Sequence, residues 1–234
     1  SKIPLRTAFI YKIFNPGTEI ILLIADQNLY ECVEKGRNDF EERITHRFVC
    51  GAIAVSDFVK GYAEKYLSCE IDVVHPFIDQ IEKYLDIERD YSDPRKVLFV
   101  GKNYPNKNVD TLREAVKSLD QTERILVGEG HEESDHERID VRGYVDDLLD
   151  VYKEADIYVQ PSDGDAFPVA SLEAMASGLP TIVTDKCGTR SVVEKVDEEL
   201  ITTTDKSGLR NTISGLQEMN SQERKEKGDK LRDN

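Results

Sequence analysis

Two carboxylates, Asp165 and Glu173, are eight positions apart where a predicted strand runs into a predicted helix. Asp165 lies in the connecting loop and Glu173 about two turns down the helix, so both can face one cleft. A carboxylate accepts paired hydrogen bonds from neighbouring hydroxyls of a ribose or a sugar ring. The free N–H groups and the dipole of the helix start attract anions. The spacing therefore predicts an anion site next to bound hydroxyl groups.

The alternative interpretation is that Asp165 caps the helix and Glu173 is exposed to solvent. That interpretation leaves unexplained why a glutamate stands within residues 172–176, a stretch otherwise suited to burial. A role for both carboxylates in binding is therefore preferred.

Two lysines follow the strand predicted at 96–100. Gly101 allows a tight turn directly after the strand, and Lys102 and Lys107 are five positions apart on the same loop. Both ammonium groups can reach a single diphosphate. The alternative is a pair of solvated loop lysines, which this feature alone does not exclude.

Two more glycine-containing segments end predicted strands, Val-Gly-Glu-Gly at 127–130 and Val-Arg-Gly-Tyr-Val at 141–145. Gly128 permits a ligand or a neighbouring loop to approach the backbone closely. The strand end that leads into Tyr144 and Val145 offers backbone donors and acceptors to a flat base. Each segment is equally typical of an ordinary turn, so neither predicts a site by itself.

Alternating strands and helices position these loops. Continuously apolar strands separated by helices of about ten residues predict βαβ units and a parallel sheet. In the second part of the chain we expect strands at 96–100, 124–127, 156–159 and 181–184, and helices at 109–119, 147–154 and 167–177. The candidate loops then lie at the carboxyl ends of strands, where open α/β sheets bind ligands.

The first part of the chain repeats this pattern in a shorter form. Ser56 is placed to cap one of its helices. The predicted strands are 20–25, 52–55 and 71–74, and the predicted helices are 40–49 and 57–66. Three strands are too few for a complete doubly wound domain. The charged segment 221–234 has few apolar residues, which predicts a helix that packs weakly or frays.

Charge and composition narrow the class of partner. The formal net charge is −15 over 234 residues, so a nucleic acid or an anionic lipid surface is a poor partner. No segment approaches the roughly 18 apolar residues of a membrane span. No signal segment opens the sequence, so we expect a cytosolic protein.

The cysteines and histidines lack the spacing of metal ligands. His131 and His136 stand in an acidic loop without a matching ligand cluster. We expect reduced and mostly buried thiols at the four cysteines, Cys32, Cys50, Cys69 and Cys187.

Together these motifs resemble the C-terminal nucleotide-binding domain of retaining GT-B glycosyltransferases of the group 1 family. That family carries two glutamates with seven residues between them, within Glu-Gly-Phe-Gly and a following Leu-Glu-Ala-Met-Ala-x-Gly-x-Pro. The corresponding text here is Asp-Ala-Phe-Pro at 165–168 and Leu-Glu-Ala-Met-Ala-Ser-Gly-Leu-Pro at 172–180. Three other segments match the family in order: 101–108, 127–130 and 143–145. The resemblance covers roughly residues 48–220.

The resemblance implies a role for each candidate residue. Lys102 and Lys107 would neutralise the donor diphosphate and stabilise the leaving group as its charge develops. Glu173 would bind the ribose hydroxyls, and Asp165 would bind hydroxyls of the transferred sugar. The other residues implied in nucleotide binding are Gly101, Gly128, Tyr144, Val145, Phe167, Pro168, Val169 and Ala170. Retention of the anomeric configuration and independence from a metal ion are implied as well.

The sequence departs from the family pattern at several points. Asp165 is one methylene shorter than the family's glutamate, and Lys102 replaces an arginine, which removes bidentate geometry but keeps the charge. Pro168 replaces a glycine and lacks its N–H. The family's Gly-Gly-x-x-Glu loop reads Cys-Gly-Thr-Arg-Ser at 187–191, so its glutamate is missing and Arg190 adds a positive charge nearby.

These observations predict an α/β protein of GT-B type, with Rossmann-like parallel sheets flanked by helices. We expect a reduced first lobe at 1–90, a complete nucleotide-sugar-binding lobe at 91–220, and a charged helix at 221–234. Neither His46 nor His75 stands in a context that matches the family's catalytic histidine.

The predicted function is retaining transfer of a sugar from a nucleotide sugar, a UDP- or GDP-sugar, to a glycan, lipid or small-molecule acceptor. No other cofactor is expected, and the location is cytoplasmic or peripheral to the membrane. The oligomeric state is open, and a second chain is one way to complete the shortened lobe. The alternative is a nucleotide-sugar-binding module or partner subunit without turnover, which the short first lobe and the altered motifs favour. A sugar-nucleotide epimerase of the same fold is a weaker alternative, because the match at 165–180 has the transferase spacing.

Overall fold

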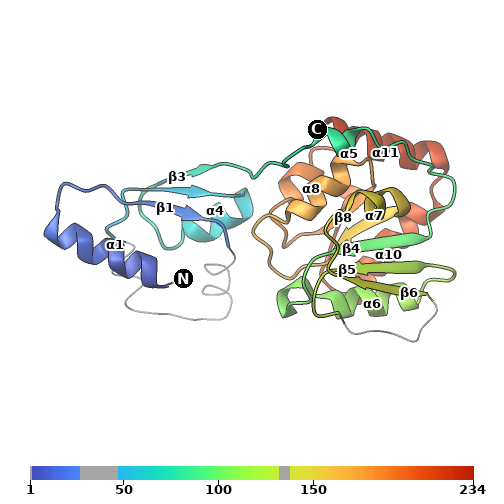
Figure 1. The fold of residues 1–234 in the computed structure, drawn as a ribbon, viewed down its shortest axis with the longest axis horizontal. Coiled ribbons are helices and arrows are strands. Elements are labelled where there is room, and N and C mark those ends of the chain that lie inside the picture. Colours follow the sequence, from blue (N-terminus) through green and yellow to red (C-terminus); the bar gives the residue numbers. More distant parts are fainter. Residues whose placement is uncertain (1, 27–46, 132–137) are drawn as a thin grey trace. The chain divides into compact units, whose positions relative to one another are not determined.

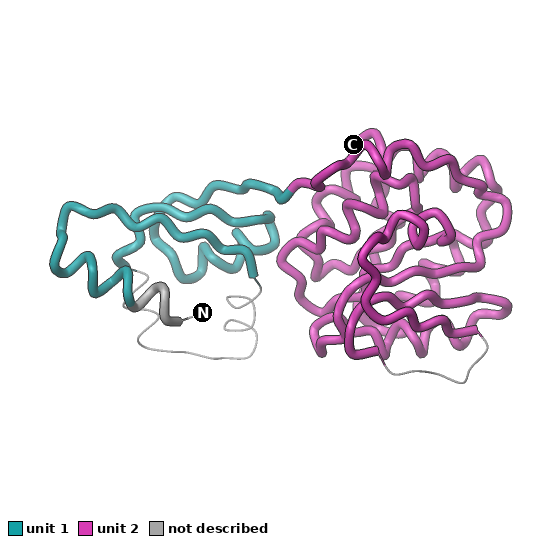
Figure 2. The backbone as a smooth tube through the Cα atoms, viewed as in Figure 1, with its two compact units in different colours: residues 1–76 teal, residues 77–234 magenta. Residues whose placement is uncertain are grey.

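The computed structural model describes residues 2–26, 47–131 and 138–234. The chain forms two compact units, Ser1–Pro76 and Phe77–Asn234 (Figure 2). Each unit has its own parallel sheet. The division falls before the expected boundary at residue 90, because Tyr84 and Ile87 are buried in the core of the second unit.

The first unit is built on three short parallel strands in the order β1-β2-β3 (Figure 1). Its elements are α1 (Lys2–Phe14), β1 (Ile21–Ile24), β2 (Gly51–Ala54), α4 (Asp57–Ala63) and β3 (Glu70–Val73). The Ser56 hydroxyl accepts a hydrogen bond from the N–H of Val59 at 3.2 Å, which confirms the predicted cap of α4. The three predicted strands are confirmed, whereas most of the helix predicted at 40–49 lies outside the described residues.

The second unit contains a six-stranded parallel sheet in the order β6-β5-β4-β7-β8-β9. Its strands are β4 (Lys96–Val100), β5 (Glu123–Val127), β6 (Ile139–Gly143), β7 (Ile157–Gln160), β8 (Thr181–Thr184) and β9 (Ile201–Thr202). The chain winds outward from β4 to β6, returns to β7 beside β4, and then winds outward in the other direction. This reversal between β4 and β7 is the kind of position at which doubly wound sheets bind ligands.

Helices cover both faces of this sheet (Figure 1). The helices described in this unit are α5 (Glu82–Leu85), α6 (Val109–Lys117), α7 (Leu149–Glu154), α8 (Val169–Ala176), α9 (Arg190–Val193), α10 (Lys206–Glu218) and α11 (Ser221–Asp233), and its two short 3-10 helices are η1 (Pro105–Lys107) and η2 (Glu198–Leu200). Phe99 on β4 packs in one core cluster with residues of α6 and α10, while the adjacent Leu98 packs in a second cluster with residues of α5 and α7. The apolar strands are therefore covered on both sides, as their sequence predicts.

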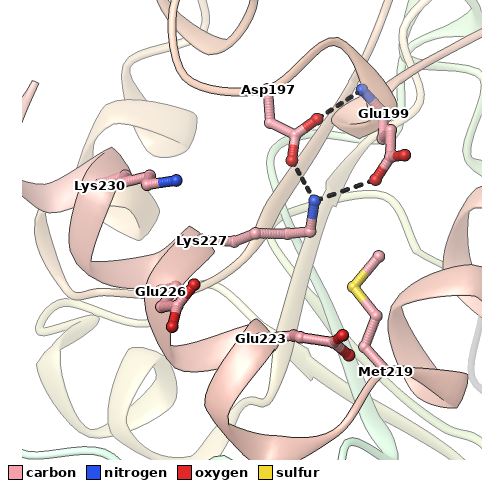
Figure 3. A pocket seen from close by; sticks show the side chains of 7 residues that line it. All are labelled: Asp197, Glu199, Met219, Glu223, Glu226, Lys227 and Lys230. Atoms are coloured by element: carbon pink, nitrogen blue, oxygen red, sulfur yellow. Dashed lines mark hydrogen bonds and ion pairs between the residues drawn. The ribbon is translucent and has the colours of Figure 1, made fainter.

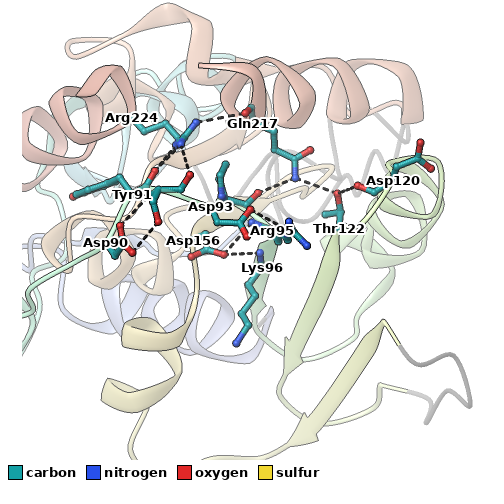
Figure 4. A network of polar contacts seen from close by, with 12 residues as sticks. Asp90, Tyr91, Asp93, Arg95, Lys96, Asp120, Thr122, Asp156, Gln217 and Arg224 are labelled. Atoms are coloured by element: carbon teal, nitrogen blue, oxygen red, sulfur yellow. Dashed lines mark hydrogen bonds and ion pairs between the residues drawn. The ribbon is translucent and has the colours of Figure 1, made fainter. Parts of the chain in front are cut away.

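The last helix, α11, docks firmly on the second unit, so the prediction that it packs weakly is wrong. Arg224 is 4% exposed, and its guanidinium donates to the carbonyl of Tyr91 at 2.6 and 2.9 Å and to that of Ser92 at 3.2 Å (Figure 4). Leu231 is buried in the core. The helix buries Arg224, Gly228 and Leu231 rather than an apolar stripe, and hydropathy does not reveal such a face.

Arginines from two segments hold the C-terminal end of α8. Arg89 donates to the carbonyls of Ser177, at 3.0 and 3.2 Å, and Ala155, at 2.6 Å. Arg232 donates to the carbonyls of Ser177 at 3.0 Å and Ile87 at 2.9 Å. Burial lowers the pKa of Arg89 to about 10, so it stays protonated at neutral pH. Cations at this position complement the helix dipole and pair its last carbonyls.

We expect Arg224→Ala to lower the free energy of unfolding by about 2–4 kcal/mol, because buried carbonyls lose their charged donor. Equilibrium unfolding in urea measures this change. Lys225→Ala is the matched control, since Lys225 pairs with Asp229 at the exposed surface, and its unfolding midpoint should match the wild type. Equal midpoints for the two variants would show that the Arg224 contacts contribute nothing.

Candidate functional site

The candidate site lies where four neighbouring strands end. The loops predicted from sequence follow β4, β5, β6 and β7, which are adjacent in the sheet. Three of these loops turn at glycines with positive φ: Gly101 at 155°, Gly128 at 129° and Gly143 at 60°. Such angles suit glycine, so the sequence signal at these strand ends has a conformational cause.

Gly128 is required by a close approach between loops. A Cβ at this position would lie 2.1 Å from the carbonyl oxygen of Gly101. The N–H of Gly101 donates to the carbonyl of Val127 at 2.8 Å, and the N–H of Gly128 donates to the carbonyl of Gly143 at 2.6 Å. The sequence predicted that Gly128 lets either a ligand or a neighbouring loop approach the backbone, and the structure shows the approach of a neighbouring loop.

Gly128→Ala should lower the free energy of unfolding by about 3 kcal/mol or more, because the methyl group and the Gly101 carbonyl cannot occupy the same space. Gly143→Ala is the control: its φ is also positive, but nothing lies within 4 Å of the added Cβ. Its cost is the left-handed backbone alone, about 1–2 kcal/mol. Urea unfolding of both variants compares them, and an equal or smaller loss for Gly128→Ala would refute the steric argument.

Lys107 and Asp165 form an ion pair across the reversal between β4 and β7. The Lys107 Nζ lies 2.5 Å from the Asp165 Oδ2, and the two side chains are only 20% and 10% exposed. Neighbouring bonds fasten the two loops together: the N–H of Asp163 donates to the Asn106 carbonyl at 2.7 Å, and the Asn106 side chain donates to the Gly164 carbonyl at 3.0 Å. The structure thus joins two site residues that the sequence separates by 58 positions.

Buried polar side chains stand behind Asp165. The Tyr158 hydroxyl donates to Gln160 Oε1 at 2.6 Å, and Gln160 Nε2 donates to Ser162 Oγ at 2.8 Å. Gln160 Nε2 and Ser162 Oγ each lie 3.4 Å from Asp165 Oδ2. Asp165 does not cap the following helix, whose N-cap is Pro168 without a side-chain bond, so the capping alternative is wrong.

Glu173 lies in the middle of α8 and is held by tyrosine. Its Oε2 accepts a hydrogen bond from the Tyr152 hydroxyl on α7 at 2.8 Å. Glu173 is half-buried rather than exposed, as its apolar sequence surroundings predict. The sequence analysis missed Tyr152, Gln160 and Ser162; the last two stand five and three positions before Asp165, and that proximity was the available signal.

The start of α8 presents backbone N–H groups at the same loop. The N–H groups of Val169 and Ala170 stand in the first helical turn, where no intrahelical acceptor exists. Pro168 contributes none, and Phe167 is buried beside it. Two helical N–H groups therefore remain to meet an anion.

The remaining predicted residues lie in more exposed positions. Lys102 is 54% exposed and pairs with Glu129 at 2.6 Å, and this hydrogen bond raises the pKa of Lys102. Tyr144 is 73% exposed, whereas Val145 packs against the core. Arg190 is exposed and pairs with Glu194 at 3.1 Å.

Metal-binding and thiol groups add little to this site. Within residues 2–26, 47–131 and 138–234, no group of three or more His, Cys, Asp and Glu side chains is arranged to hold a metal ion.

Cys187 is buried next to the Asp165 loop, and burial raises its pKa to about 12. Cys50 is exposed and Cys69 half-buried, so the expectation of mostly buried thiols is wrong for these two. Cys32, His46 and His136 lie outside the described residues.

A cavity of about 220 Å³ lies elsewhere, between α11 and the segment around η2 (Figure 3). Its charged lining consists of four carboxylates and two lysines: Asp197, Glu199, Glu223, Glu226, Lys227 and Lys230. Lys227 already pairs with Asp197 and, at 3.1 Å, with Glu199. The surplus of negative charge makes this cavity unsuited to a diphosphate.

Residues 94–218 match the family described as Glycosyl transferases group 1, and the chain belongs to that family. Its fold is the GT-B type, in which parallel sheets are flanked by helices. HepE from Anabaena, in complex with UDP and glucose, has a TM-score of 0.77 at 16% identity over 100% of this chain and 70% of that chain. Sucrose-phosphate synthase from Thermosynechococcus elongatus has a TM-score of 0.75 at 19% identity over 91% of this chain and 62% of that chain.

Among curated proteins, phosphatidyl-myo-inositol mannosyltransferase from Mycobacterium leprae is 27% identical over 165 residues. The match covers 63% of this chain and 44% of that protein. The chain therefore spans about half the length of the curated relatives it matches. In the described ranges, no helix combines the length and the apolar character needed to cross a membrane.

Proposed function

We propose that the second unit binds a nucleotide-sugar donor for retaining transfer of its sugar to an acceptor, without a metal ion. The observation that carries this proposal is the Lys107–Asp165 pair at the reversal between β4 and β7, directly before α8. The pair holds one ammonium group at a helix start that already favours anions. A diphosphate at this position would meet the Lys107 Nζ and the N–H groups of Val169 and Ala170.

The same groups would stabilise the leaving group. As the bond between the sugar C1 and the β-phosphate oxygen breaks, negative charge builds on that oxygen, and Lys107 and Lys102 would stabilise it. The acceptor hydroxyl forms its bond to C1 on the same face and gives its proton to the departing phosphate. The lysines would supply the charge that a metal ion supplies in other enzymes.

The two carboxylates would bind the two sugars of the donor. Glu173 would accept hydrogen bonds from the ribose hydroxyls, and Asp165 from hydroxyls of the transferred sugar. Support for a UDP-sugar comes from HepE, whose solved complex contains UDP and glucose. Support for a GDP-sugar comes from the GDP-mannose-dependent alpha-mannosyltransferase of Mycolicibacterium smegmatis, which is 30% identical over 103 residues. The phosphatidyl-myo-inositol mannosyltransferase of Mycobacterium leprae supports a lipid among the proposed acceptors and a position at the membrane periphery.

Calorimetric titration with UDP, GDP, ADP and their sugar conjugates in EDTA should show saturable binding of one nucleotide. We expect Lys107→Ala and Glu173→Ala each to reduce that affinity at least about 30-fold, because a charged hydrogen bond is lost in each. Lys117→Ala is the control, since Lys117 ends α6 and pairs with Glu114 at the exposed surface. Unchanged nucleotide affinity in both site variants would refute the assignment of Lys107 and Glu173 to the binding site.

Asp165→Asn separates sugar binding from nucleotide binding. The variant keeps the side-chain volume but removes the charge that accepts sugar hydroxyls and pairs with Lys107. We expect the affinity for the sugar nucleotide to fall at least about tenfold relative to the affinity for the free nucleotide. The ratio of the two dissociation constants measures this effect, and an equal change in both constants would contradict the role of Asp165.

The second candidate function is a nucleotide-sugar-binding module or partner subunit without turnover. Pro168 favours it, because this residue removes one backbone donor at the phosphate-facing loop. The test measures donor binding, donor hydrolysis and sugar transfer to a panel of lipid and glycan acceptors. A protein that binds the donor but neither hydrolyses it nor transfers its sugar would support the binding module over the enzyme.

A further inference from the structure

The carboxylate of Glu173 is supported by a fully buried hydroxyl. Tyr152 is 0% exposed, and its hydroxyl lies 2.8 Å from Glu173 Oε2 and 3.1 Å from the carbonyl oxygen of Ala170. A phenol has one proton to donate. The bond to the carboxylate is shorter and charge-assisted, so the Tyr152 hydroxyl donates its hydrogen bond to Glu173 rather than to the carbonyl of Ala170.

Tyr84 approaches the same carboxylate from another element. Tyr84 lies on α5, is buried, and packs edge-on against Tyr152 with ring centroids 5.6 Å apart. Burial raises the pKa of Tyr84 well above its usual range, and the charge of Glu173 together with a hydrogen bond to it raises that pKa further. The pKa of Tyr152 is likewise raised well above its usual range, first by burial. Both phenols therefore stay protonated and act as donors.

These contacts restrict a side chain that is otherwise flexible. A glutamate has three rotatable bonds, and fixing them at the moment of binding costs conformational entropy. Tyr152 and Tyr84 remove that freedom before a ligand arrives, while the partial exposure of Glu173 leaves the carboxylate accessible. A ligand without the matching hydroxyls would leave a positioned carboxylate unpaired, and sites built in this way reject such ligands.

Resting on the proposed function, we infer that Tyr152 and Tyr84 are positioning residues that hold Glu173 for the ribose diol. They thereby set a preference for ribonucleoside over dideoxyribonucleoside diphosphates. The tyrosines act through Glu173 and contribute to discrimination between ligands, in addition to their contribution to the core.

The test compares binding of UDP and 2′,3′-dideoxy-UDP, or the same pair with the base that the nucleotide titration selects. We expect the wild type to bind the intact ribose at least about tenfold more tightly. In Tyr152→Phe and Tyr84→Phe this ratio should fall toward one, through weaker binding of the ribonucleotide with little change for the dideoxy analogue.

Tyr91→Phe is the matched control, because the Tyr91 hydroxyl donates to the Gly178 carbonyl at 2.9 Å, just beyond the C-terminal end of α8 and away from Glu173. It should lower thermal stability and keep the wild-type ratio. The inference would be overturned if both tyrosine variants kept the wild-type ratio. It would also be overturned if the wild type bound both nucleotides equally, although in either case the proposed donor site would still stand. A wild type that binds no nucleotide would overturn the proposed function itself.

Discussion

Parallel strands covered by helices on both faces leave only their carboxyl ends open to a ligand. In the second unit, the loops after β4 and β7 leave the sheet in different directions, and the space between them is where Lys107 meets Asp165 at 2.5 Å. This pair keeps an ammonium group close to the helix start in a protein whose net charge is −15. The pair carries no net charge, so the candidate site is locally less negative than the surface as a whole.

The two lysines that resemble the family's diphosphate-binding pair are not equivalent. Lys107 is four-fifths buried and pairs with a buried carboxylate, where solvent and salt screen charges weakly. Lys102 is half exposed and pairs directly with Glu129 at the solvent-exposed surface, where such pairs contribute little. The difference in burial makes Lys107 the principal cation of the site and Lys102 a secondary one.

The strands from β4 to β8, the helices α6, α7 and α8 and the two carboxylates of the site follow from sequence pattern, because apolar runs and the motif at 165–180 are local signals. The side chains that contact those carboxylates cannot be predicted from the sequence pattern. Lys107 reaches Asp165, and Tyr84 reaches Glu173, only because the sheet order and the packing of α5 and α7 place them there. The docking of α11 was not predicted for the same reason, since its buried face consists of a glycine, a leucine and an arginine that donates to backbone carbonyls.

The contacts of α11 also bear on the order of events during synthesis. The carbonyls of Ile87 and Tyr91 receive their guanidinium donors from Arg232 and Arg224, which the ribosome adds after all six strands of the sheet. Domains fold as units from the N-terminal side as the chain emerges. The nascent second unit must therefore carry these open acceptors until α11 has been translated, and it cannot complete its native hydrogen bonding before then.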